Sequence, residues 1–209
     1  MKGHLMENWK SNIVNEMKKK MDEGHVLEFV HTPKCSGRYA REYLRDLGIK
    51  NSGHHRPNKN HTNRIFFTTI REPAARFESQ LNWRLGQWGG RLTSKSRKDI
   101  GVPKKKWDES MSLNDIMEQM TDKQIVGFRP YRSLVYWSQG VDLLITVDEL
   151  LPTLKLLGFD IVRKHKPKGV SKKNRGILSV ENIRRLRNIF AEDVQLFKHW
   201  TRDGVLRND

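Results

Sequence analysis

The sequence predicts an α/β protein, a three-layer α/β/α sandwich with a central parallel sheet. Short apolar runs at 26–31 and 65–70 have the composition of strands that are buried on both faces. Each run is followed at once by a helical pattern, over 36–47 and 73–85, as in a sheet whose parallel strands are joined through helices. A third strand is expected at 142–147, and all three strands are expected to be central and parallel.

The remaining segments fit a single domain that spans residues 1–209. Apolar residues at helical spacing predict an amphipathic helix over 5–23, within an N-terminal segment 1–24, that packs on the domain. A long basic excursion occupies 86–110. Helical patterns follow at 113–120, 124–128 and 131–138. A basic loop and a long C-terminal helix are expected within 166–209, and the helix begins at Ser179, a favourable N-cap with Glu181 in the first turn.

The strongest candidate for a binding site is the turn after the first strand, TPKCSGR at 32–38. A helix entered from such a turn presents unpaired N–H groups and the positive end of its dipole, which together attract an anion. Lys34 and Arg38 add full positive charges. The turn is not a Walker A sequence, because its lysine precedes the glycine. The alternative interpretation is a strand–turn–helix that merely carries basic residues.

A second cationic position follows the second strand. Arg71 stands where that strand ends, and Glu72 and Pro73 suit the beginning of a helix. Ligands of open α/β sheets bind beyond the carboxyl ends of the strands, so Lys34 and Arg71 are expected on one rim. Alternatively, Arg71 and Arg76 form a helix start that is solvated or paired with neighbouring glutamates.

Together the two segments resemble the sulfotransferase family that uses 3'-phosphoadenosine 5'-phosphosulfate (PAPS). That family has a TPKxxGT turn for the 5'-phosphosulfate and a strand that ends in RxPxxRxxS for the 3'-phosphate. This chain has TPKCSGR at 32–38 and REPAARFES at 71–79. Arg38 departs from the pattern, since it replaces a small hydroxyl residue and adds a guanidinium. Segments 141–159 and 166–197 are also similar to the family, in particular to its carbohydrate sulfotransferase branch.

The resemblance implies a P-loop-like sulfotransferase fold and an enzyme that transfers the sulfuryl group of PAPS to a hydroxyl, expected to belong to a carbohydrate. Lys34 would neutralise the oxygen that leaves with the 5'-phosphate. The implied PAPS-binding residues are Pro33, Lys34, Cys35, Ser36, Gly37 and Arg38 in the turn, Arg71 and Ser79 at the 3'-phosphate, and Ser171, Lys172, Lys173 and Arg175 in a basic loop that covers the nucleotide.

The acceptor hydroxyl needs a general base whose pKa lies near neutrality, and histidine is the natural choice. Carbohydrate sulfotransferases that this chain resembles often place a catalytic histidine between the first helix and the second strand, where His54 and His55 stand. We expect His55 to be the base, with His54 as the neighbouring candidate. His31 is a third candidate, but it is expected to pack beside the turn. For each histidine, an ordinary structural role is the alternative.

No metal is expected, because the sequence has no DxD pair, HExxH motif or Cys/His ligand spacing. The single cysteine, Cys35, excludes an internal disulfide framework and suits a reducing compartment. The sequence has no apolar run of eighteen residues and no apolar signal core at its start. The expected location is therefore the cytoplasm, with a trimmed form of an anchored protein as the alternative.

The charge of the chain favours an anionic partner. There are 40 basic and 24 acidic residues, for a net charge of +16, which suits a nucleotide, a sulfated or carboxylated glycan, a nucleic acid or a membrane surface. The family resemblance implies an anionic or hydroxyl-bearing acceptor, expected to be a glycan. One alternative function is a nucleic-acid-binding module in which Trp, Arg and Lys of 83–107 grip phosphates and stack on bases. Another is a P-loop-like nucleotide kinase, which the missing Walker A sequence disfavours.

Overall fold

A computed structural model of the chain describes residues 4–53, 62–87, 111–128, 132–162, 165 and 176–201. These residues divide into two compact units. The first unit contains the described residues up to Arg71, those from Leu134 to His165, and 196–201. The second contains the described residues from Glu72 to Ser133 and 176–195.

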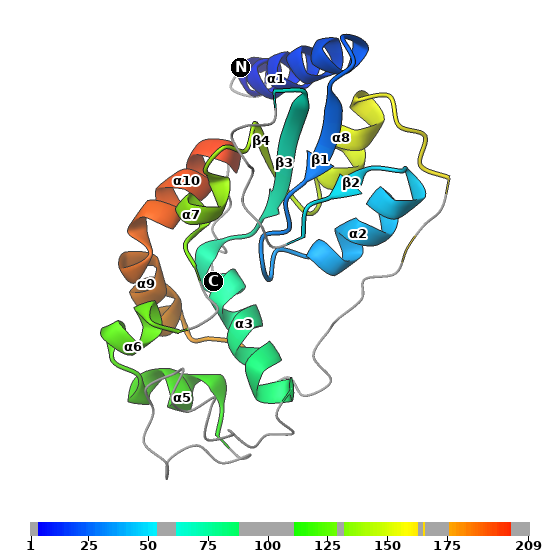
Figure 1. The fold of residues 1–209 in the computed structure, drawn as a ribbon. Coiled ribbons are helices and arrows are strands. Elements are labelled where there is room, and N and C mark those ends of the chain that lie inside the picture. The colour runs from blue at the N-terminus through cyan, green and yellow to red at the C-terminus, as the bar shows by residue number, and fades with distance from the viewer. Residues whose placement is uncertain are drawn as a thin grey trace. The chain divides into compact units, whose positions relative to one another are not determined.

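The first unit is built on a parallel sheet (Figure 1). Its strands are β1 (Val26–Phe29), β2 (Lys50–Asn51), β3 (Arg64–Ile70) and β4 (Leu143–Thr146). In the described residues their order is β2-β1-β3-β4. The three predicted strands are therefore present and parallel. β4 is an edge strand of this sheet, so the expectation that all three are central is wrong for β4, and the short strand β2 was not predicted.

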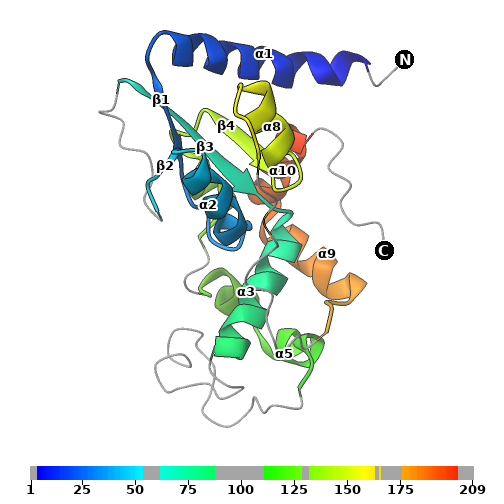
Figure 2. The ribbon, with the colours of Figure 1, turned by 90° about the vertical axis from the view of Figure 1, so that its right-hand side faces the viewer.

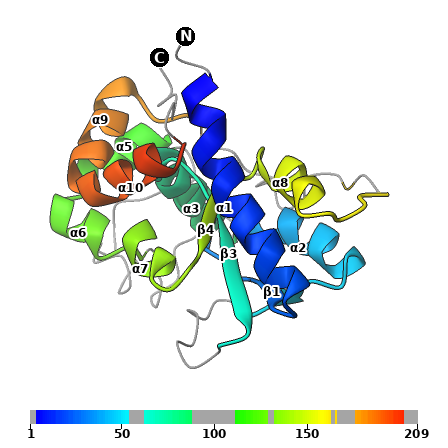
Figure 3. The same ribbon diagram turned by 90° about the horizontal axis from the view of Figure 1, so that it is seen from above.

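Helices pack on both faces of this sheet and across one of its ends. They are α1 (His4–Asp22), α2 (Gly37–Asp46), α7 (Leu134–Ser138), α8 (Leu150–Leu156) and the end of α10 (Ala191–Thr201). Phe67 and Ile145 point into the cluster that contains α2 and α8, whereas Ile70 and Leu144 pack with Leu134 of α7. Figure 3 shows α2 and α8 on one side of the strands and α7 on the other. This arrangement is consistent with the predicted α/β sandwich.

α1 lies across the end of the sheet at which the strands begin (Figure 2). Val14 and Met17 are buried in the cluster that also contains strand and α2 residues. The predicted amphipathic helix at 5–23 is therefore confirmed, and it packs on the sheet as expected. Among the described residues, no helix is both long enough and apolar enough to cross a membrane.

The second unit is helical, with α3 (Pro73–Gln87), α5 (Leu113–Gln119), α6 (Asp122–Val126), α9 (Val180–Ile189) and the start of α10. Phe77 of α3 is fully buried against Phe128 and Phe190, with ring centroids 5.3 and 6.0 Å away. The predicted N-cap is confirmed, because the Ser179 side chain accepts a hydrogen bond from the N–H of Asn182. The long C-terminal helix is interrupted at Phe190, which leaves helical geometry and joins this aromatic cluster.

Candidate functional site

The turn between β1 and α2 has a strained backbone. Lys34 and Ser36 have positive φ angles of 66° and 60°, and Cys35 between them does not. This left-handed conformation costs about 1–2 kcal/mol for each non-glycine residue, so the surrounding structure must hold the turn in place. Alternating handedness also turns successive N–H groups toward one concave side, which is a common way to bind an anion.

Two threonines at the end of β3 hold this turn. The Thr69 hydroxyl donates to the carbonyl of Cys35 at 2.5 Å, and the Thr68 hydroxyl donates to the carbonyl of Val30 at 2.6 Å. The hydroxyls of Thr68 and Thr32 are 2.8 Å apart. All three threonines are buried, so these hydrogen bonds do not compete with water. Sequence reasoning missed this support, although two consecutive threonines in an otherwise apolar strand were a visible signal.

Gly37 begins α2 directly beneath the imidazole of His31. A Cβ atom at Gly37 would lie 1.9 Å from Cδ2 and 2.0 Å from Nε2 of His31. His31 is buried and its ring stacks on Phe29 at a centroid distance of 6.4 Å, so the imidazole has little room to move. Only glycine therefore allows the start of α2 to lie this close to the His31 imidazole. His31 packs beside the turn, as expected from the sequence.

This contact makes the variant Gly37→Ala informative. We expect it to lower the free energy of unfolding by about 1–3 kcal/mol, the usual cost of overpacking a buried site. In a His31→Ala background the ring is gone, and the same change at Gly37 should cost clearly less. Urea unfolding of the four proteins measures the coupling. An equal cost in both backgrounds would show that the contact with His31 does not explain the glycine.

Three cationic side chains meet at the carboxyl edge of β1 and β3. Lys34 is half-buried in the turn, Arg38 is exposed in the first turn of α2, and Arg71 directly follows β3. Burial, and then the charges of Arg71 and Arg38, lower the pKa of Lys34 to about 8. Lys34 and Arg71 thus lie at the same end of the sheet, as the parallel pairing of β1 with β3 requires.

The first turn of α2 adds to this positive potential. The N–H groups at the start of a helix have no partner within the helix, and the Ser36 side chain forms no capping hydrogen bond with them. No acidic residue stands in the first turn of α2, so the helix dipole is not offset there. Backbone and side chains therefore combine to favour an anion at this position.

The other residues predicted for the turn differ in what they could offer a ligand. Pro33 and Ser36 are half-buried. The thiol of Cys35 is only 1% exposed and packs among apolar side chains that include Ile70 and Phe197, so only the backbone of Cys35 could reach a ligand. The predicted residues His54, His55, Ser171, Lys172, Lys173 and Arg175 lie outside the described residues, as does 88–110.

The second predicted motif continues into α3, in the second unit. Ser79 is half-buried in α3. That Ser79 binds a 3'-phosphate together with Arg71 stays a prediction. Arg76 is 1% exposed and lies 4.0 Å from the carboxylate of Asp193, which is equally buried. Arg76 is therefore a buried structural cation and not a solvated one. Glu72 caps α3, since its carboxylate accepts the N–H of Ala75 at 2.7 Å.

Comparison with family models, with curated proteins and with solved structures found no match to this chain. Within the described part of the chain, no group of three or more His, Cys, Asp or Glu side chains is placed to hold a metal ion. Fold and site together define an α/β protein with an all-parallel sheet and a cationic strand–turn–helix at the carboxyl edge.

Proposed function

We propose that this protein is a PAPS-dependent sulfotransferase that modifies a hydroxyl group, in particular one of a carbohydrate. The observation that carries the proposal is the environment of Lys34. Lys34 lies half-buried in a strained turn beside two arginines, which makes its charged form unfavourable. A bound anion would offset this unfavourable free energy. Strain and mutually repelling charges of this kind are kept at functional sites more often than elsewhere.

Each cation has a role in this proposal. Lys34 contacts the oxygen between sulfur and the 5'-phosphate, where negative charge grows as the bond to sulfur breaks. The N–H groups at the start of α2 and the Arg38 guanidinium bind the remaining phosphosulfate oxygens. Arg71 binds the 3'-phosphate, and the family resemblance assigns Ser79 to the same phosphate and Ser171, Lys172, Lys173 and Arg175 to the cover of the nucleotide.

The reaction is an in-line displacement, comparable in geometry to phosphoryl transfer. The acceptor oxygen forms a bond to sulfur, the bond from sulfur to the phosphate oxygen breaks, and His55 takes the proton of the acceptor hydroxyl. Most of the rate enhancement then comes from positioning and from positive charge arranged in advance. The lowered pKa of Lys34 suits this task, because the negative charge that grows on the leaving oxygen stabilises the charged form of the lysine.

The test of this proposal compares two nucleotides that differ in the 3'-phosphate. We expect 3'-phosphoadenosine 5'-phosphate (PAP) to raise thermal stability, since a ligand at 100 times its dissociation constant adds about 2.7 kcal/mol to the folded state. ADP, which lacks the 3'-phosphate, should have a much smaller effect at the same concentration. Differential scanning fluorimetry in 150 mM salt measures both.

Three other results would contradict the proposal. The absence of a PAP effect at millimolar concentration would exclude a PAPS site. An equal effect of ADP and PAP would favour a kinase-like nucleotide site instead. Stabilisation by short oligonucleotides that exceeds that by PAP, and that falls steeply with salt, would favour the nucleic-acid-binding alternative.

A further inference from the structure

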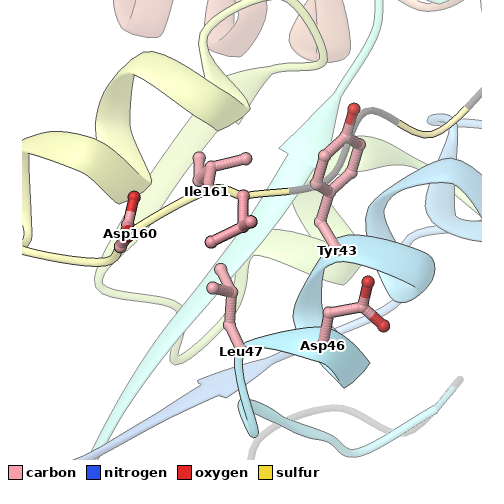
Figure 4. Close-up of a pocket in the computed structure, with 6 residues that line it drawn as sticks. Tyr43, Asp46, Leu47, Asp160 and Ile161 are labelled. Atoms are coloured by element: carbon pink, nitrogen blue, oxygen red, sulfur yellow. The ribbon is translucent and has the colours of Figure 1, made fainter.

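A pocket on the first unit differs in charge from the rest of the molecule. It lies between α2 and the segment after α8, and it is lined by Tyr43, Asp46, Leu47, Asp160, Ile161 and Val162. In Figure 4 the Leu47 side chain points from the end of α2 toward the segment that carries Asp160 and Ile161, and Asp46 and Asp160 lie on opposite sides of it. The charged lining residues are thus two aspartates, in a chain whose net charge is +16.

His165 holds two of the lining residues, Tyr43 and Asp46, in place. Its backbone N–H donates to the Tyr43 hydroxyl at 2.9 Å, and its Nε2 lies 2.8 Å from a carboxylate oxygen of Asp46. The imidazole packs edge-on against the Tyr43 ring at a centroid distance of 4.6 Å. Three separate contacts therefore hold the segment after α8 against α2.

One face of α2 connects this pocket with the cationic turn. Tyr39, Tyr43 and Leu47 recur every four residues on it, and the Tyr39 hydroxyl donates to that of Tyr43 at 3.3 Å. α2 runs from Gly37 at the turn to Asp46 at the pocket, which is about 14 Å at 1.5 Å per residue. A ligand with one end at Lys34 and the other in the pocket would span about this length, outside the ring of Tyr43, which is buried.

The lining selects against negative charge. Carboxylates accept hydrogen bonds from hydroxyl and ammonium groups, and they repel sulfate and carboxylate groups. The aliphatic lining residues Leu47, Ile161 and Val162 offer apolar surface to the C–H face of a sugar ring. The pocket volume of about 260 Å³ is below the usual range of roughly 300–1,000 Å³ for small-molecule sites, so it suits one end of a longer ligand.

We infer that this pocket binds the distal part of the acceptor, and that the acceptor is an oligosaccharide without negative charge. The inference rests on the proposed sulfotransferase function, and it narrows the acceptor to neutral or amino-bearing sugars. The positive charge of the chain would then bind the nucleotide. Binding of the distal sugar would position the reacting hydroxyl near Lys34.

The experiment measures trisaccharide binding by isothermal titration calorimetry without nucleotide, so that its outcome does not depend on PAP. The probes are N-acetylated chitotriose (neutral), chitosan trisaccharide (amino-bearing) and trigalacturonate (anionic). We expect the first two to bind, and Asp160→Lys to weaken both by about tenfold or more, since hydrogen bonds to a charged partner are lost. Asp22→Lys makes the same charge change at an exposed residue that ends α1, and it should leave both affinities unchanged.

The outcomes separate this inference from the proposed function. If PAP stabilises the protein but neither N-acetylated chitotriose nor chitosan trisaccharide binds at 10 mM, the acceptor inference is overturned and the sulfotransferase proposal stands. Equal affinities in the parent protein and in Asp160→Lys would also overturn it. If N-acetylated chitotriose and chitosan trisaccharide bind at the pocket but PAP gives no stabilisation, the sulfotransferase proposal and the acceptor role are both overturned. The pocket is then a carbohydrate-binding site without a role in sulfuryl transfer.

Discussion

Replacing Lys34 by methionine is expected to stabilise the ligand-free protein at pH 7 and to abolish most of the sulfuryl transfer. Burial, together with Arg71 and Arg38, lowers the pKa of Lys34 to about 8, so below that pH the folded protein holds a cation in unfavourable surroundings. Methionine has a similar shape and no charge. The same charge is proposed to neutralise the leaving oxygen, so turnover should fall by about a hundredfold or more. Thermal unfolding and transfer of labelled sulfate measure the two effects.

The stability gained from Lys34→Met should depend on pH. Unfolding leaves the pKa of Lys34 at its ordinary value of 10.5, whereas the folded protein lowers this pKa to about 8. Between these values the unfolded state binds more protons, so the stability of the parent protein rises with pH. The advantage of the variant should therefore be full below pH 8 and fade by pH 10.5. Lys155→Met, at an exposed position of α8, should show neither effect. A variant less stable than its parent at pH 7 would refute the unfavourable burial of the Lys34 charge.

Arg71→Ala is expected to remove most of the stabilisation by PAP and to leave the smaller effect of ADP nearly unchanged. The guanidinium is proposed to form charge-assisted hydrogen bonds with the 3'-phosphate, which ADP lacks. Arg71→Lys should be intermediate, because lysine keeps the charge but loses the two-pronged geometry. Scanning fluorimetry with both nucleotides measures these differences.

Arg71→Ala also has a readout that needs no nucleotide. Arg71 is one of the causes that lower the pKa of Lys34, after burial, so its removal should raise that pKa while burial keeps it below 10.5. The titration of labelled Lys34 by NMR measures this shift. Arg41→Ala, at an exposed position of α2, should change neither the PAP effect nor the Lys34 titration. Loss of the ADP effect together with the PAP effect would mean that Arg71 does not act through the 3'-phosphate.

Local patterns in the sequence were enough to predict the main elements of the fold. Apolar runs predicted β1 and β3, and the following helical patterns predicted α2 and α3. Ser179 and the Glu72–Pro73 pair predicted two helix starts, because capping depends on residues within one turn. Parallel pairing then brought Lys34 and Arg71 to one edge. These features involve neighbouring residues or the general rules of α/β folds, so one sequence suffices for them.

The tertiary structure alone decided the features that join distant residues. The hydrogen bond from Thr69 to Cys35, the burial of Arg76 beside Asp193 and the contact of His165 with Tyr43 all join different elements. No local pattern encodes them, because a hydroxyl, a guanidinium or an imidazole finds its partner only after the chain has packed. The break at Phe190 and the edge position of β4 have the same origin. The sequence thus determined which charges stand at the turn, and tertiary packing decided how strongly Lys34 is desolvated and where the acidic pocket forms.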